Sequence, residues 1–154
     1  HIYHYFENKE AIIADIVAED MEHLLRLTAE LRAASDVKSA MIERAVEGVE
    51  DNLDPGTAGL QLEIVAEAAR NPRIAEIVRA ADQQCRDSLA ETLRSLRRAG
   101  GHQDSEALLG GMVEALAAMF EGLRIRAIRH PDIDRDMVVK MFRRMVSDLL
   151  SQTP

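Results

Sequence analysis

The sequence predicts an all-α fold, a bundle of several helices, and three observations support that prediction. Apolar residues recur at the three- and four-residue spacing of one helix face along most of the chain. No segment alternates apolar and polar residues in the way that a half-buried strand does. Asn71-Pro72, Gly100-Gly101 and His130-Pro131 separate the periodic segments. Six helices are expected, over residues 9–33, 36–53, 58–70, 72–99, 105–129 and 134–150.

Capping residues and one loop delimit the first three predicted helices. Asn8 suits the N-cap of the first helix, because its side chain can accept a hydrogen bond from a free backbone N–H. Ser35 or Asp36 suits the same position of the second helix. A Pro-Gly pair within residues 54–57 predicts a loop there, so the third helix is expected to begin at residue 58.

The last three predicted helices have clearer boundary signals. Asn71 can cap the fourth helix and Pro72 suits its first turn, where a missing N–H costs nothing. The glycine pair at Gly100 is expected to stop it. Ile133 and Val138 have the spacing of a hydrophobic staple, which predicts that the sixth helix begins at residue 134.

Composition narrows the classes of protein to which the chain can belong. Its 154 residues suit one domain, or one domain and a fragment of another, and 47% hydrophobic with 30% charged residues is globular. The net charge of −8 makes most of the surface unsuited to nucleic acid. Cys85 is the single cysteine, which excludes a disulfide framework within the chain. No apolar run of about 20 residues and no signal-peptide pattern occurs, so a soluble, cytoplasmic domain is expected.

The fifth and sixth predicted helices carry more apolar surface than one core requires. The apolar arc of the sixth helix is roughly twice the ~100° that a helix packed on a single core needs, and the fifth helix is broader still. We therefore expect a symmetric homodimer formed through these two helices; the alternative is that both helices are central in a monomer. The expected interface residues are Leu116, Met119, Phe120, Leu123, Met141, Phe142, Met145 and Leu149.

The opening residues resemble a known family. Tyr3, Tyr5, Phe6, Lys9 and Glu10, followed by aliphatic residues, match the end of the helix-turn-helix and the start of the next helix in TetR-family transcriptional regulators. Residues 60–72 are similar to the sixth helix of that family and its turn into the seventh, and the succession of helix lengths fits as well.

The resemblance implies a division of the chain and a set of DNA contacts. Residues 1–8 would be the remnant of a helix-turn-helix, and residues 9–154 an effector-binding and dimerisation domain. By position, Tyr3, Tyr5 and Lys9 would contact phosphates and His4 would lie near base edges. Earlier parts of the motif would precede residue 1, so operator DNA is expected as a partner of the full-length protein and not of this chain alone.

Polar residues on otherwise apolar helix faces predict where a small-molecule effector would bind. A polar group that faces a core must be paired, hydrated or available to a ligand. In the family that the chain resembles, a pocket lies among these helices, and methionines make adaptable walls. The candidate pocket residues are Asp20, His23, Thr28, Met41, Ser88, Thr92 and Met112. The alternative is structural: hydroxyls often bond back to their own helix, and a histidine can be satisfied within a core.

Signs of catalysis are absent from the sequence. A di-metal centre in a helical bundle requires Glu-x-x-His on two helices, and the nearest approach, Asp20-x-x-His23, occurs once. No phosphate-binding loop or nucleophile elbow occurs either. We therefore expect no enzyme activity, metal or cofactor, and Cys85 to be a small buried hydrophobe. The expected function is a ligand-responsive transcriptional repressor released by its effector; the alternative is a stand-alone helical dimer that acts as a scaffold without binding DNA.

Overall fold

The computed structural model describes residues 2–151, with side chains from residue 7 onward, and every regular element in that range is a helix. The all-α prediction is therefore confirmed. The helices are α1 (Ile2–Ala33), α2 (Val37–Leu53), α3 (Pro55–Arg70), α4 (Pro72–Ala99), α5 (Glu106–Arg129) and α6 (Arg135–Ser151). Within the described range, no helix is both long and apolar enough to cross a bilayer.

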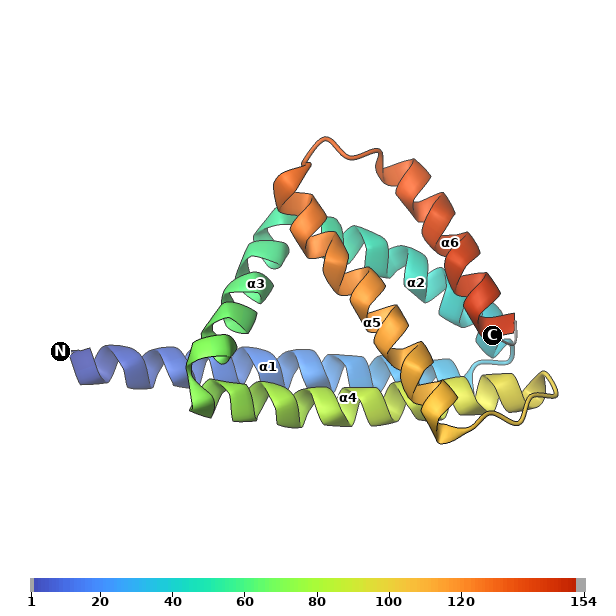
Figure 1. Cartoon of the computed structure of the whole chain (residues 1–154), viewed down its shortest axis with the longest axis horizontal. Helices are drawn as coiled ribbons and strands as arrows, with labels where there is room; N and C mark the ends of the chain where they lie inside the picture. The colour runs from blue at the N-terminus through green and yellow to red at the C-terminus, as the bar shows by residue number, and fades with distance from the viewer. Residues whose placement is uncertain (1, 152–154) are drawn as a thin grey trace.

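Two layers of helices make up the structure. The long helices α1 and α4 lie side by side and run in the same direction, and the N-terminal part of α1 extends past the other helices (Figure 1). Helices α2, α5 and α6 form the second layer, in which α2 packs on both α5 and α6. Helix α3 joins the layers and contacts both α4 and α5.

Three apolar clusters hold these helices together. The largest lies between α2, α4, α5 and α6 and includes Leu93, Leu109 and Val146. The second joins α2, α3, α5 and α6, and the third joins α1, α3 and α4. In the second layer the Phe120 and Phe142 rings meet edge to face, with centroids 5.3 Å apart. Helix α1 packs most extensively on α4, and its side chains also reach α3.

Most predicted boundaries are confirmed. Asp36 Oδ1 accepts a hydrogen bond from the backbone N–H of Ser39 at 3.1 Å, which caps α2. Asn71 caps α4 and Ser105 caps α5 in the same way. Gly101 has a φ of 89°, a left-handed conformation that glycine adopts readily, and the chain leaves α4 there.

Two predicted boundaries are wrong. Asn8 lies inside α1, which runs from Ile2 without a break, because no glycine or proline interrupts residues 2–8. The third helix begins at Pro55 and not at residue 58. Asp54 Oδ2 accepts from the Thr57 N–H at 2.9 Å, so the Pro-Gly pair lies in the first turn of the helix and not in a loop.

Candidate functional site

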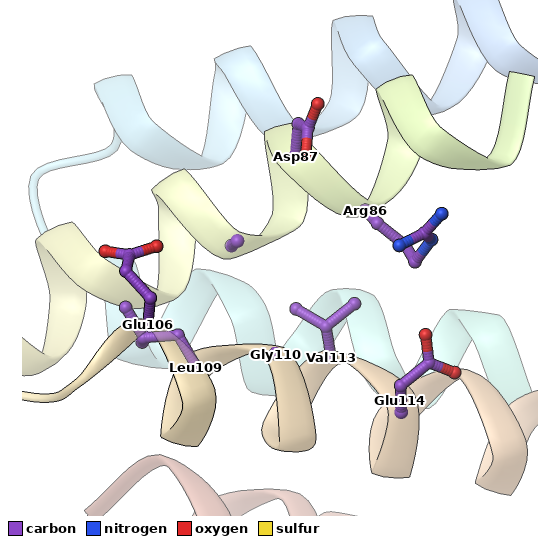
Figure 2. A pocket seen from close by; sticks show the side chains of 8 residues that line it. Arg86, Asp87, Glu106, Leu109, Gly110, Val113 and Glu114 are labelled. Atoms are coloured by element: carbon purple, nitrogen blue, oxygen red, sulfur yellow. The ribbon is translucent and has the colours of Figure 1, made fainter. Parts of the chain in front are cut away.

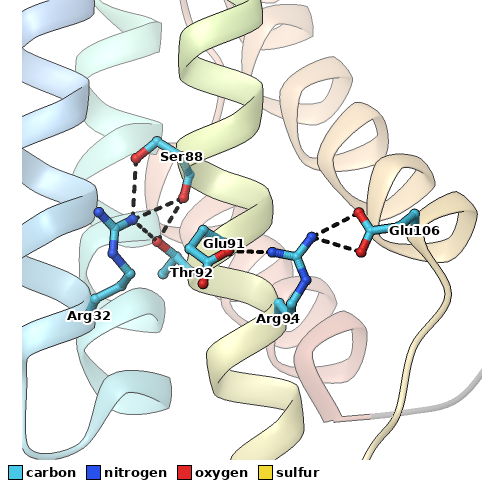
Figure 3. Close-up of polar contacts among 6 residues, drawn as sticks. All are labelled: Arg32, Ser88, Glu91, Thr92, Arg94 and Glu106. Atoms are coloured by element: carbon cyan, nitrogen blue, oxygen red, sulfur yellow. Dashed lines mark hydrogen bonds and ion pairs between the residues drawn. The ribbon is translucent and has the colours of Figure 1, made fainter.

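A cluster of hydroxyl groups and one arginine joins α1 to α4. The Oγ atoms of Thr28 and Ser88 are 2.6 Å apart (Thr28 Oγ1, Ser88 Oγ). Arg32 Nη1 donates to Thr92 Oγ1 at 2.9 Å, to the Ser88 carbonyl at 3.1 Å and to Ser88 Oγ at 3.3 Å (Figure 3). Thr28, Arg32, Ser88 and Thr92 are called the hydroxyl cluster below. It brings together three of the predicted pocket residues.

Each hydroxyl in this cluster also bonds within or between the helices. Thr28 Oγ1 contacts the carbonyls of Leu24 and Leu25 at 3.0 Å, and Thr92 Oγ1 donates to the Ser88 carbonyl at 3.0 Å. The back-bonding that the sequence left as an alternative is therefore present, and it coexists with the bonds between helices.

Sequence reasoning missed Arg32, the only charged member of the cluster. It lies one turn after Thr28, so helical spacing alone puts both side chains on the same face of α1. A cation in the last turn of a helix is common because it favours the helix dipole, and for that reason Arg32 carried no distinct signal.

The predicted methionines lie in the adjacent apolar core. Met41 and Met112 are both buried in the largest cluster, together with Leu93, which follows Thr92 in the chain. Partly buried Leu31 and Leu89 pack against the same cluster and are the chain neighbours of Arg32 and Ser88. The two methionines therefore belong to the apolar core and not to the hydroxyl cluster.

Asp20 and His23 do not face the core as predicted. Both are exposed, and Asp20 Oδ2 accepts a hydrogen bond from Gln61 Nε2 at 2.7 Å. The helical wheel placed them on an apolar arc, but only α4 packs extensively along α1, so only part of that arc is covered. Their role in effector binding stays a prediction, and the structure does not bring them into the hydroxyl cluster.

A hollow of about 320 Å³ lies between α4 and α5. Its lining includes the apolar residues Ala90, Leu109 and Val113, and charged side chains from both helices (Figure 2). Its charged lining residues are Arg86, Asp87, Glu106 and Glu114. None of the predicted pocket residues lines this hollow. Cys85 directly precedes the lining residue Arg86 and is half-buried. Burial raises the pKa of its thiol, which keeps the thiol protonated.

The predicted DNA contacts fall at the other end of α1. The side chains of Tyr3, His4 and Tyr5 lie outside the described residues. Lys9 Nζ donates to Glu67 Oε2 at 3.1 Å, and this hydrogen bond holds the pKa of the buried Glu67 carboxyl below its ordinary value. The ammonium group of Lys9 is thus paired within the protein, and its phosphate contact stays a prediction.

A second pair of contacts fixes α1 at the turn between α3 and α4. Glu10 Oε1 accepts from Asn71 Nδ2 at 3.1 Å and pairs with Arg73 at 3.2 Å. Hydrogen bonds at both ends of the α1–α4 contact therefore join residues about 60 apart in the chain. They hold the two helices in one register.

The predicted dimer residues divide between the core and the surface. Leu116 and Leu123 are buried in the core of the chain itself, so they have little surface left for a partner. Phe120 and Phe142 face each other, and Met119 and Leu149 pack against the same core. Of the eight predicted interface residues, only Met141 and Met145 are exposed. Part of the wide apolar surface of α5 and α6 packs within the chain's own second layer.

The exposed apolar face is different from the predicted one. Met137, Met141 and Met145 lie one turn apart on α6 and are 50%, 43% and 44% exposed. Ile125 and Ile128 are exposed on α5. These five residues are called the apolar strip below. Sequence reasoning assigned two of its members to the interface and missed Ile125, Ile128 and Met137.

Arg97 of α4 forms a buried ion pair with the loop before α5 and also bonds to the end of α6. Arg97 is fully buried, and its Nε and Nη2 donate to the two oxygens of Asp104 at 2.5 and 3.0 Å. Its Nη1 donates to the carbonyls of Leu149 and Leu150 at 3.4 and 3.3 Å, near the C-terminus of α6. The guanidinium thus fixes α6 against α4.

Known proteins share the sequence pattern and the fold described above. A sequence profile described as BetI-type transcriptional repressor, C-terminal, matches residues 36–151, which contain α2 to α6. The chain belongs to the TetR family of transcriptional regulators. The resemblance seen in the sequence is therefore confirmed.

Two curated relatives of this TetR-family chain are the HTH-type transcriptional regulators UidR of Escherichia coli (strain K12) and of Shigella flexneri. Each is 28% identical to it over 99 residues, which is 64% of the chain and 50% of the relative. The chain thus spans about half the length of these relatives. The solved structure of Salmonella enterica GusR matches with a TM-score of 0.71 at 24% identity, over 98% of this chain and 77% of that one. That likeness shows a shared fold.

Proposed function

We propose that the chain is the effector-sensing and dimer-forming part of a DNA-binding transcriptional repressor that leaves its operator when a small molecule binds. The observation that carries the proposal is the hydroxyl cluster. It ties α1, whose first residues resemble a DNA-contacting motif, to α4 through four polar side chains. A ligand that competes for these hydrogen bonds would change how α1 lies on α4.

The proposed homodimer forms through the apolar strip. Exposed apolar side chains that share a helix face mark protein interfaces, and the three methionines of the strip follow one face of α6. In a two-fold symmetric dimer the same surface meets itself, so α5 and α6 of each copy would bury the strip of the other. Methionine side chains adapt well to such a surface.

The proposed mechanism couples α1 to the separation of two DNA-reading segments. In a symmetric dimer these segments must match half-sites separated by a fixed number of turns of the duplex. A change in the tilt of α1 would alter that separation, and an effector preference of about 1–3 kcal/mol for one state is enough for a useful response. We propose that the protein acts in the cytoplasm, without catalysis, metal or cofactor. Tyr3, His4, Tyr5 and Lys9 stay the proposed DNA contacts of the full-length protein.

The test uses the full-length protein and DNA from its own promoter region. Fluorescence anisotropy measures the binding of a labelled fragment, and a thermal-shift screen finds small molecules that raise the melting temperature. Any such molecule is then added to the protein–DNA complex, and release of the fragment is expected. A dimer that binds no promoter fragment would overturn the proposal in favour of the scaffold.

A further inference from the structure

Arg32 uses one of its two terminal nitrogens in hydrogen bonds with the described residues. These bonds run from Nη1, to Ser88 and Thr92. Figure 3 shows Nη1 turned toward these residues and the other terminal nitrogen turned away from them. Among the residues whose side chains are described, none accepts from Nε or Nη2 of Arg32. That edge of the guanidinium is the one that can hold two oxygens side by side.

Arg97 shows in the same chain what this edge does. Its Nε and Nη2 hold both oxygens of Asp104, while its Nη1 donates to backbone carbonyls. Arg32 repeats half of this pattern: Nη1 bonds to a carbonyl and two hydroxyls, and the Nε–Nη2 edge has no carboxylate. The comparison gives the geometry that an acid at Arg32 would adopt.

The missing carboxylate sets Arg32 apart from other arginines that are not exposed. Five such arginines in the described part of the chain form ion pairs: Arg44, Arg86, Arg94, Arg97 and Arg135. Arg124 bonds to Asn52, and its charge opposes the rise that burial gives to the pKa of the Glu121 carboxyl. Arg32 has no acid within ion-pair distance among the described side chains. A half-buried cation without a counter-charge attracts an anion.

The unused edge is open to a ligand. No buried polar side-chain atom in the described part of the chain lacks a hydrogen-bond partner. Because Nε and Nη2 of Arg32 have no partner among the residues from 7 to 151, they are not buried, and solvent reaches them. The three bonds from Nη1 fix the orientation of the guanidinium, so a ligand would lose little of its binding energy in ordering it.

We propose that the Nε–Nη2 edge of Arg32 binds the carboxylate of a small organic acid. The proposal rests on the proposed function, because it names the chemical class of the effector at the contact between α1 and α4. A carboxylate matches the edge in shape, since it is planar and presents two oxygens. It also matches the site in charge, because one arginine neutralises one negative charge. A bound acid would complete the ion pair and shift the bonds from Arg32 to Ser88 and Thr92.

The test follows the Arg32 Nε–H resonance by NMR in the chain labelled with ¹⁵N-arginine, and benzoate is the probe. The signal is assigned by its loss in Arg32→Lys. Benzoate is expected to shift it saturably, whereas neutral benzamide of the same shape leaves it in place. Arg26 is the matched control: it lies on the same helix, is exposed and forms no ion pair among the described residues. Its resonance should not move saturably.

Variants then connect the shift to binding. Benzoate affinity, measured by calorimetry, is expected to fall about tenfold or more in Arg32→Met, the loss expected for charge-assisted hydrogen bonds. Arg32→Lys keeps the charge but not the two-nitrogen edge, so its benzoate affinity should lie between that of the original chain and that of Arg32→Met. Arg26→Met should bind like the original chain. Far-UV circular dichroism checks that each variant is folded.

Three results would overturn the carboxylate site. They are a benzoate affinity unchanged in folded Arg32→Met, an equal response to benzamide, or a saturable response to inorganic phosphate with none to benzoate. Failure of the site and failure of the proposed function are distinguishable. A neutral effector that releases DNA would reject the site alone, and benzoate binding by a full-length protein that binds no promoter DNA would reject the function alone.

Discussion

Replacing Asp104 with alanine is expected to destabilise the chain by about 3–5 kcal/mol, the usual cost of removing one partner of a buried ion pair. Arg97 is fully buried and Asp104 has only 7% of its side chain exposed. The change removes two charge-assisted hydrogen bonds to the buried guanidinium. The hydrogen bonds from its Nη1 to the α6 carbonyls stay in place.

The assay is urea unfolding followed by circular dichroism, at one fixed protein concentration because a dimer's stability depends on it. The matched control removes an exposed ion pair, that of Arg143 and Glu43, whose side chains are 47% and 63% exposed. Glu43→Ala should cost no more than about 1 kcal/mol. A loss below about 1 kcal/mol for Asp104→Ala, equal to that of the control, would refute the reasoning.

The same pair predicts a pH dependence. Hydrogen bonding to Arg97 lowers the pKa of Asp104 from its ordinary value of 3.8, so the folded state favours the charged carboxylate. Its contribution to stability is complete above the unfolded pKa and is lost as the pH falls below about 3.8. The difference in unfolding free energy between the original chain and Asp104→Ala should therefore shrink in that acid range. A difference that stays constant down to pH 2 would contradict this assignment.

Two further predictions concern the surface and the backbone. Met141→Glu should convert the proposed dimer to a monomer in sedimentation, because it places a charge in the apolar strip. Val65→Glu, at an exposed apolar position on α3, should leave the dimer intact. Gly59→Ala should stabilise α3 by up to ~1 kcal/mol, since an added Cβ meets no atom within 4 Å. Gly101→Ala should destabilise by about 1 kcal/mol, because alanine is strained at its φ of 89°. Urea unfolding checks both, and equal signs for the two glycines would contradict the argument.

Local chemistry made most of the secondary structure predictable from the sequence. The caps at Asp36, Asn71 and Ser105 depend on residues two or three positions away, so they can be read without the fold. The polar residues Thr28 and Ser88 could be found in the same way, because they interrupt an apolar helix face. Two predicted helix boundaries were wrong because the same residues are compatible with two structures. The Pro-Gly pair before α3, for example, forms the first turn of the helix and not a loop.

Tertiary structure alone decided which side of each helix is covered and which charges meet. Helical periodicity placed Asp20 on an apolar arc, but coverage depends on where neighbouring helices lie, and α1 is packed extensively only by α4. Leu123 turned inward for the same reason, since the chain's own second layer occupied that face. Arg32 reaches Thr92 across 60 residues, and its unused edge became visible only beside the completed pair at Arg97. Such contacts form between surfaces that folding brings together, and no local spacing records them.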